Sequence, residues 1–125
     1  MTQPHKFPFT IAYADTDAGG IAYHARYIEI AERARMNWLN GRIPPNGGVG
    51  FVIKELNIKY LTPLKLADDF VVETRMLKQG GASIVVEHKF IRGDEVCAAI
   101  TGTAAYIGSD FKPKRIPPEY IAEIV

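Results

Sequence analysis

Four β-rich segments follow one another in the second half of the chain, and short stretches separate them. The segments cover residues 51–61, 70–78, 83–92 and 95–107, and the sequences between them are TPLKLADD, QGGA and GD. Val, Ile, Thr and aromatic residues favour strands, whereas Gly, Pro and Asp favour turns. Connections this short join antiparallel neighbours, because parallel strands need a crossover of a dozen or more residues. The sequence therefore predicts four antiparallel strands in a meander.

One amphipathic helix precedes these segments, in residues 24–40. Its apolar side chains recur at spacings of three and four, at Tyr27, Ile30, Ala31, Ala34 and Trp38. That spacing predicts a helix of about four or five turns, ended by Gly41. Residues 7–15 alternate like a half-buried strand, the Pro- and Gly-rich residues 41–50 are expected to form a loop, and a short helix is expected from Pro118. This order indicates an α+β protein whose helix packs against one face of a five-stranded antiparallel sheet.

Length and composition exclude several classes of protein. With 125 residues the chain has the size of one domain, so we expect a single domain over residues 1–125. Its 15 Lys and Arg residues nearly balance 14 Asp and Glu residues, which argues against nucleic-acid binding. Without a leader-like N-terminus or an apolar run of about 18 residues, we expect a cytoplasmic protein with no integral membrane segment. Open sheet edges in so small a chain favour association with a second copy.

Groups that could perform chemistry concentrate between the first strand and the helix, in YADTDAGGIAYH, residues 13–24. Asp15 or Asp17 could act as a nucleophile or general base, although Asp is also a common turn residue. The two glycines that follow permit a ligand to approach the backbone, or they only turn the chain. His24 could orient or protonate a reacting group, or simply form a hydrogen bond at the helix start. An acid beside the unpaired N–H groups of a helix start is the outline of an acyl-transfer site.

Other candidate groups are sparse. His, Cys and carboxylate side chains lack the spacing of metal ligands, so we expect no metal site. The single cysteine, Cys97, lies in an apolar run and is expected to be a buried, inert thiol. Lys112, Lys114 and Arg115 form the densest basic cluster. Such a cluster is commonly solvated surface, but it could also hold a phosphate-bearing ligand.

Three segments together resemble a known family. YADTDAGGIAYHARYIEIAERARMNWL, IKYLTPLKLADDFVVETRM and KPKRIP are similar to the hotdog-fold acyl-CoA thioesterases of the 4-hydroxybenzoyl-CoA thioesterase family, in particular to its YbgC-like, Tol-Pal-associated branch. The resemblance spans almost the whole chain. It implies a hotdog fold, in which a five-stranded antiparallel sheet wraps a long central α-helix. It also implies a homo-oligomer with active sites at the dimer interface, expected to be a dimer of dimers, that is, a homotetramer.

The resemblance further implies a hydrolase that cleaves the thioester of acyl-CoA to a free carboxylic acid and CoA. No cofactor is implied, because coenzyme A is part of the substrate. The catalytic carboxylate of the family corresponds to Asp17, and Asp15 becomes structural. Tyr13 and His24 stand where YbgC-like members carry the accompanying tyrosine and histidine. The backbone amides of Tyr23 and His24 would polarise the thioester carbonyl.

Several alternatives remain open at this point. Lys112, Lys114 and Arg115 lie roughly where relatives bind the CoA nucleotide, and they are the candidate CoA-binding residues. The substrate could instead be an aromatic acyl-CoA of the 4-hydroxybenzoyl type or an acyl group on acyl carrier protein. A non-catalytic acyl-CoA-binding module is a further alternative. Asp17 could attack the thioester to form a mixed anhydride, or it could activate water.

Overall fold

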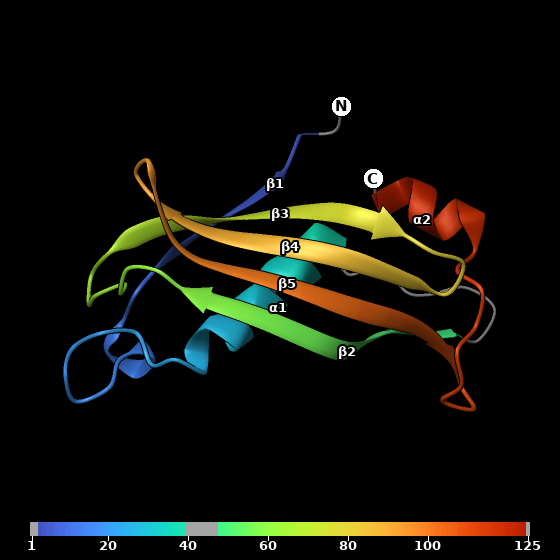
Figure 1. Ribbon diagram of the computed structural model, residues 1–125, viewed down its shortest axis with the longest axis horizontal. Helices are drawn as coiled ribbons and strands as arrows, with labels where there is room; N and C mark the ends of the chain where they lie inside the picture. The colour runs from blue at the N-terminus through green and yellow to red at the C-terminus, as the bar shows by residue number, and fades with distance from the viewer. Residues whose placement is uncertain (1–2, 40–47, 125) are drawn as a thin grey trace.

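The computed structural model describes residues 3–39 and 48–124. Five strands and two helices follow in the order β1 (His5–Thr10), α1 (Arg26–Leu39), β2 (Gly48–Tyr60), β3 (Asp69–Gln79), β4 (Ser83–Arg92), β5 (Glu95–Gly108) and α2 (Pro118–Ile124). The strands form one antiparallel sheet in the order β1-β3-β4-β5-β2. Helix α1 crosses one face of this sheet, and α2 lies near the end of β3 (Figure 1). Neither described helix is long and apolar enough to cross a membrane.

The predicted five-stranded antiparallel sheet is confirmed, but the predicted four-strand meander is wrong. β3, β4 and β5 do form a meander, whereas β2 pairs with β5 and β1 pairs with β3. The connection formed by residues 61–68 therefore crosses from one side of the sheet to the other. Two intervening strands require about 14 Å of travel, which this connection easily spans. The connection was too long to force a hairpin, so its length alone could not decide which strand β2 would pair with.

The element boundaries also differ from those expected. The first strand ends at Thr10 instead of continuing to residue 15, because Tyr13–Asp15 form a 3-10 turn. Helix α1 starts at Arg26, two residues later than predicted, and β2 already starts within the expected loop. The predicted helix stop at Gly41 and the loop residues up to 47 lie outside the described residues. The short helix expected from Pro118 is confirmed as α2.

The core lies between α1 and the sheet. Four residues of the predicted apolar helix face are buried, namely Tyr27, Ile30, Ala31 and Ala34. They belong to one cluster with buried side chains from alternate positions of the strands, among them Phe70, Val72, Phe90 and Ile100. Burying each large side chain of this kind contributes roughly 1.5–3 kcal/mol. A second cluster joins α2 to the far end of β4 and β5, and the partly buried Trp38 packs against it.

Cys97 and His88 are two residues of the sheet with titratable side chains that are buried in the protein, and only one of them was predicted to be. Cys97 is fully buried, as expected, and burial raises the pKa of its thiol. His88 on β4 is also buried, although the sequence offered no reason to place a histidine there. Its Nδ1 lies 2.8 Å from Thr74 Oγ1, and its Nε2 lies 3.4 Å from a guanidinium nitrogen of Arg35 on α1. Because a guanidinium only donates, Nε2 accepts and Nδ1–H donates to Thr74.

The buried His88 makes stability depend on pH. Burial, together with the nearby guanidinium of Arg35, lowers the pKa of His88 from 6.5 to about 3. The unfolded chain therefore binds more protons than the folded chain between these two values, and stability falls as pH falls through this window. We expect the free energy of unfolding to drop by up to about 1.4 kcal/mol per pH unit on this account. Urea unfolding at pH 7, 6, 5 and 4 measures this slope.

The matched variants are His88→Asn and His5→Gln. His88→Asn removes the buried titrating group and should flatten the slope between pH 6 and 4. His5→Gln removes a histidine of β1 instead and should leave the slope in place, because the buried imidazole is still present. An equal slope in the wild type and His88→Asn would contradict the assignment.

Candidate active site

The segment between β1 and α1 folds into a tight loop held by its own backbone. The N–H of Asp17 donates to the carbonyl of Ile21 at 3.0 Å, and the N–H of Gly20 donates to the carbonyl of Asp17 at 3.1 Å. Gly20 has a φ of +79°, in the left-handed region that disfavours side chains with a Cβ. Of the two adjacent glycines, Gly20 is therefore the one whose backbone conformation favours glycine in this turn, and Asp17 lies at the start of the turn.

The two aspartates of the loop have different environments. Asp15 is buried, its Oδ2 accepts the N–H of Ala12 at 2.8 Å, and its Oδ1 lies 3.3 Å from Nε of Arg26. Asp17 is exposed, and its Oδ1 accepts the N–H of Gly19 at 2.8 Å. Asp15 thus closes the turn before α1. The carboxylate of Asp17 is oriented by one backbone hydrogen bond and remains accessible to a ligand.

Asp17 and His24 line the same pocket. This pocket has a volume of about 410 Å³ and also contains Ile21, Ala22, Tyr27, Tyr60, Leu61, Thr62 and Pro63. The rings of Tyr27 and Tyr60 meet edge to face, with centroids 5.2 Å apart. Its walls thus come from the loop, the first turns of α1, the end of β2 and the connection after it. The pocket is mostly apolar, with a carboxylate and an imidazole at its border, as is common for small-molecule sites.

The amides at the start of α1 are not equivalent. The N–H of Tyr23 donates to the carbonyl of Asp15 at 2.9 Å, so it is already engaged. The N–H of His24 has no acceptor among the described residues. The hydroxyl of Tyr60 donates to the carbonyl of His24 at 2.7 Å and so holds this peptide from the side of β2. Of the two amides expected from the sequence, His24 alone is available to a ligand in this arrangement.

The remaining predicted site residues lie elsewhere. Tyr13 is 84% exposed and does not line the pocket. Lys112, Lys114 and Arg115 are exposed and follow the end of β5, whereas the pocket lies beside its start, where Leu61 and Thr62 donate to the carbonyl of Cys97. Along β5, Cys97 and Gly108 are roughly 35 Å apart, and the loop and the basic turn lie at opposite ends of the sheet (Figure 1). One subunit does not bring them together.

Tyr27 and Tyr60 are pocket residues that the sequence did not reveal. Tyr27 was assigned to the apolar helix face, and its ring is indeed in the core. Its hydroxyl accepts the N–H of Leu64 at 3.2 Å, at the pocket wall. Burial raises the pKa of Tyr27 more than this hydrogen bond lowers it. The sequence signal that could have identified Tyr27 is a tyrosine among aliphatic neighbours on a helix face, because its buried hydroxyl needs a polar partner.

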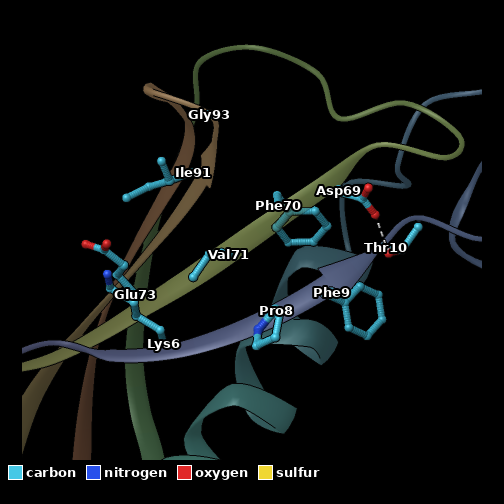
Figure 2. Close-up of a pocket in the computed structure, with 10 residues that line it drawn as sticks. All are labelled: Lys6, Pro8, Phe9, Thr10, Asp69, Phe70, Val71, Glu73, Ile91 and Gly93. Carbon is cyan, nitrogen blue, oxygen red and sulfur yellow. Dashed lines mark hydrogen bonds between the residues drawn. The ribbon is translucent and has the colours of Figure 1, made fainter.

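A larger hollow lies on the opposite face of the sheet. It has a volume of about 730 Å³, and Figure 2 shows its lining, which includes Lys6, Thr10, Asp69 and Glu73 from β1 and β3. Its polar groups pair across the strands: Thr10 Oγ1 donates to Asp69 Oδ1 at 2.6 Å, and Lys6 stands opposite Glu73. Within residues 3–39 and 48–124, His, Cys, Asp and Glu do not gather in threes as metal ligands would. The loop pocket, with its accessible carboxylate and amide, is therefore the better candidate.

Comparisons with known proteins agree on one family. A family model described as the thioesterase-like superfamily matches residues 11–124. The acyl-CoA thioesterase YbgC of Haemophilus influenzae is 35% identical over 120 residues, which cover 90% of this chain and 88% of that protein. The acyl-CoA thioester hydrolase YbgC of Escherichia coli is 27% identical over 125 residues, which cover 94% and 93%.

A structural comparison gives the same fold. A solved structure of a 4-hydroxybenzoyl CoA thioesterase mutant, complexed with 4-hydroxybenzoyl CoA, matches with a TM-score of 0.87. The match covers 99% of this chain and 100% of that chain at 18% identity, so it shows the fold alone. The five-stranded sheet and its helices thus have the hotdog-like fold of thioesterases. The chain therefore belongs to the thioesterase-like superfamily, and it is a hydrolase.

Proposed function

We propose that the protein hydrolyses acyl-CoA thioesters to a carboxylic acid and CoA, with Asp17 as the catalytic carboxylate. The names and the similarity of the Haemophilus and Escherichia relatives support the substrate class. The observation that carries the proposal is the placement of the Asp17 carboxylate and the available N–H of His24 at one pocket. A thioester needs a nucleophile or base on one side of its carbonyl carbon and a donor at its oxygen.

The chemistry follows from these two groups. The N–H of His24 lies two residues before α1, close to the helix N-terminus, where the partial positive charge of the helix dipole would help to stabilise the developing oxyanion. The Asp17 carboxylate either attacks the carbonyl carbon or removes a proton from an attacking water. Attack expels the CoA thiolate and leaves a mixed anhydride, which water then hydrolyses to restore the carboxylate. The imidazole of His24 borders the same pocket and would orient the substrate or protonate the leaving thiolate.

We further propose that two copies pair through their β2 strands. β1 and β2 are the two edges of the sheet. Pro8 on β1 has no N–H to offer another strand. The longer β2 instead carries three exposed aliphatic side chains, Val49, Val52 and Ile53, which are 50%, 40% and 40% exposed. This asymmetry favours β2 as the edge that a second copy covers, and a dimer of dimers remains the expected assembly.

Such a dimer would complete the site. Gly48, at the start of β2, pairs with Gly108, which leads into the basic turn, whereas Tyr60, at the end of β2, lines the pocket. Antiparallel pairing of two β2 strands places the start of one beside the end of the other. The basic turn of one subunit then approaches the pocket of its neighbour. Lys112, Lys114 and Arg115 are thereby proposed to bind the phosphates of a CoA whose thioester lies at the Asp17 of the other subunit.

The first test replaces the proposed catalytic group. Asp17→Asn keeps the size of the side chain but removes its charge, and we expect the hydrolysis rate to fall by about two orders of magnitude or more. Release of free thiol from short, long and aromatic acyl-CoAs measures the rate, and circular dichroism checks that the variant is folded. If neither protein released thiol from any acyl-CoA while both bound CoA, the protein would be a non-catalytic binding module.

A second test moves the carboxylate without replacing it. A Cβ on Gly19 would lie 3.2 Å from Oδ1 of Asp17, so Gly19→Ala should displace the carboxylate. We expect kcat to fall about tenfold or more, because small misplacements of reacting groups are costly. Gly81→Ala is the matched control, since a Cβ there meets no atom within 4 Å and the φ is ordinary. Equal activity of the two variants would contradict the assigned position of Asp17.

A third test asks whether the site is shared. Asp17→Asn homodimers and Lys112→Ala/Arg115→Ala homodimers should each be impaired. Heterodimers of the two variants, formed by mixed refolding, contain one site in which both the aspartate and the basic turn are intact. Because one of its two sites is intact, we expect each heterodimer to have about half of the wild-type activity. If each site used the basic turn of its own subunit, mixing would restore nothing.

A further inference from the structure

Arg92, the last residue of β4, holds the connection between β2 and β3 near both of its ends. One guanidinium nitrogen donates to Oδ2 of Asp68 at 2.7 Å and to the carbonyl of Pro63 at 3.3 Å. The other donates to Oε1 of Glu95 at 2.8 Å. Both contacts to carboxylates are charge-assisted hydrogen bonds, the stronger class of hydrogen bond. Arg92 thus bridges the β4–β5 turn and residues 61–68.

The two carboxylates in turn form hydrogen bonds to the side chain of Thr62 and to the backbone of Lys65, both in the connection. Oε2 of Glu95 accepts the hydroxyl of Thr62 at 2.9 Å, and Oδ2 of Asp68 accepts the N–H of Lys65 at 2.7 Å. The pKa of Asp68 is lowered: burial raises it, but the hydrogen bonds from Lys65 and Arg92 outweigh that effect. Asp68 therefore stays ionised at neutral pH. The guanidinium keeps both of its anionic partners under ordinary conditions.

The restrained connection is part of the pocket. Leu61, Thr62 and Pro63 form one of its walls. Beyond them, the carbonyl of Leu64 accepts the N–H of Ala22 at 2.7 Å, and the N–H of Leu66 donates to the carbonyl of Gly20 at 3.1 Å. The connection therefore touches the substrate space directly and also holds the loop that carries Asp17.

We propose that Arg92 is a positioning residue that sets the acyl-group selectivity of the pocket by fixing the wall formed by Leu61, Thr62 and Pro63. This inference rests on the proposed thioesterase function. Arg92 itself does not line the pocket and acts through its contacts with Pro63, Asp68 and Glu95, of which Glu95 accepts the hydroxyl of Thr62. A lysine cannot replace it fully, because a single ammonium group lacks the fork that spans two carboxylates.

The test compares two acyl-CoAs of different shape, benzoyl-CoA and hexanoyl-CoA. The ratio of their kcat/KM values does not depend on how much of the enzyme is folded, so lost stability alone leaves it unchanged. In Arg92→Gln we expect this ratio to shift by about tenfold, the scale on which pocket shape discriminates between similar substrates. Arg92→Lys should shift it less. An Arg92→Gln ratio equal to that of the wild type would overturn the role of Arg92.

Two control variants separate selectivity from stability. Lys89→Gln removes another β4 cation, which lies 3.9 Å from Glu87 in a looser ion pair, and should not change the ratio. Ile121→Ala weakens the second core cluster under α2, away from the pocket, and should lower the Tm without changing the ratio. A ratio that shifts in Ile121→Ala as much as in Arg92→Gln would show that the effect is nonspecific and overturn the proposal.

Amide exchange gives a readout that needs no substrate. The N–H groups of Ala22 and Leu66 should exchange faster in Arg92→Gln than in the wild type or Lys89→Gln, because both take part in hydrogen bonds that join the connection to the loop, and the connection is released. Unchanged exchange would show that Arg92 does not hold the connection of residues 61–68 in place. A wild type that hydrolyses neither substrate would overturn the proposed function and the selectivity role together, whereas an active wild type with an unchanged Arg92→Gln ratio overturns the role of Arg92 alone.

Discussion

The burial of Tyr27 between α1 and the sheet is the contact on which both the core and the pocket depend. Its ring packs against Phe90 in the core, with ring centroids 5.3 Å apart, and against Tyr60 at the pocket. Its hydroxyl accepts the N–H of Leu64, which lies in the connection beside the pocket. One side chain thus ties the helix to the sheet and to the pocket wall. Because α1 cannot shift without moving Tyr27, the helix start near His24 is held by the same packing that stabilises the fold.

The loop before α1 shows how local hydrogen bonding separates two similar carboxylates. Asp15 is enclosed and paired with Arg26 and the N–H of Ala12, so its charge serves to close the turn. Asp17 accepts one backbone N–H and otherwise faces the pocket. Asp15 is the buried partner of this ion pair, whereas the Arg26 side chain is 32% exposed and also pairs with Glu29. The division of roles therefore follows from burial and not from the chemistry of the side chain.

The pairing of β2 with β5 has the largest consequences for function. It makes β2 an edge strand, and it sends residues 61–68 across the end of the sheet to border the pocket. It also places the basic turn after β5 beside the start of β2, at the opposite end from the pocket. The strand order thus explains two features. The basic turn and Asp17 are far apart within one chain, and the β2 edge is exposed. The proposed pairing of a second copy through β2 would cover this edge and bring a basic turn to the pocket.

The sequence by itself determined which helices and strands form, although not all of their ends, and which chemical groups the loop contains. The three-and-four spacing identified the buried face of α1, the turn residues marked the ends of β3, β4 and β5, and the loop motif gave Asp15, Asp17 and His24 as candidates, among which the family resemblance selected Asp17. These features are local, because they depend on residues close together in the chain. Only the tertiary structure decided the strand order, the position of residues 61–63 in the pocket, the loss of the Tyr23 amide to Asp15, and the burial of His88. The Tyr23–Asp15 hydrogen bond depends on how the irregular loop closes on itself, and the other features depend on contacts between distant segments. A sequence pattern of period two or 3.6 specifies neither.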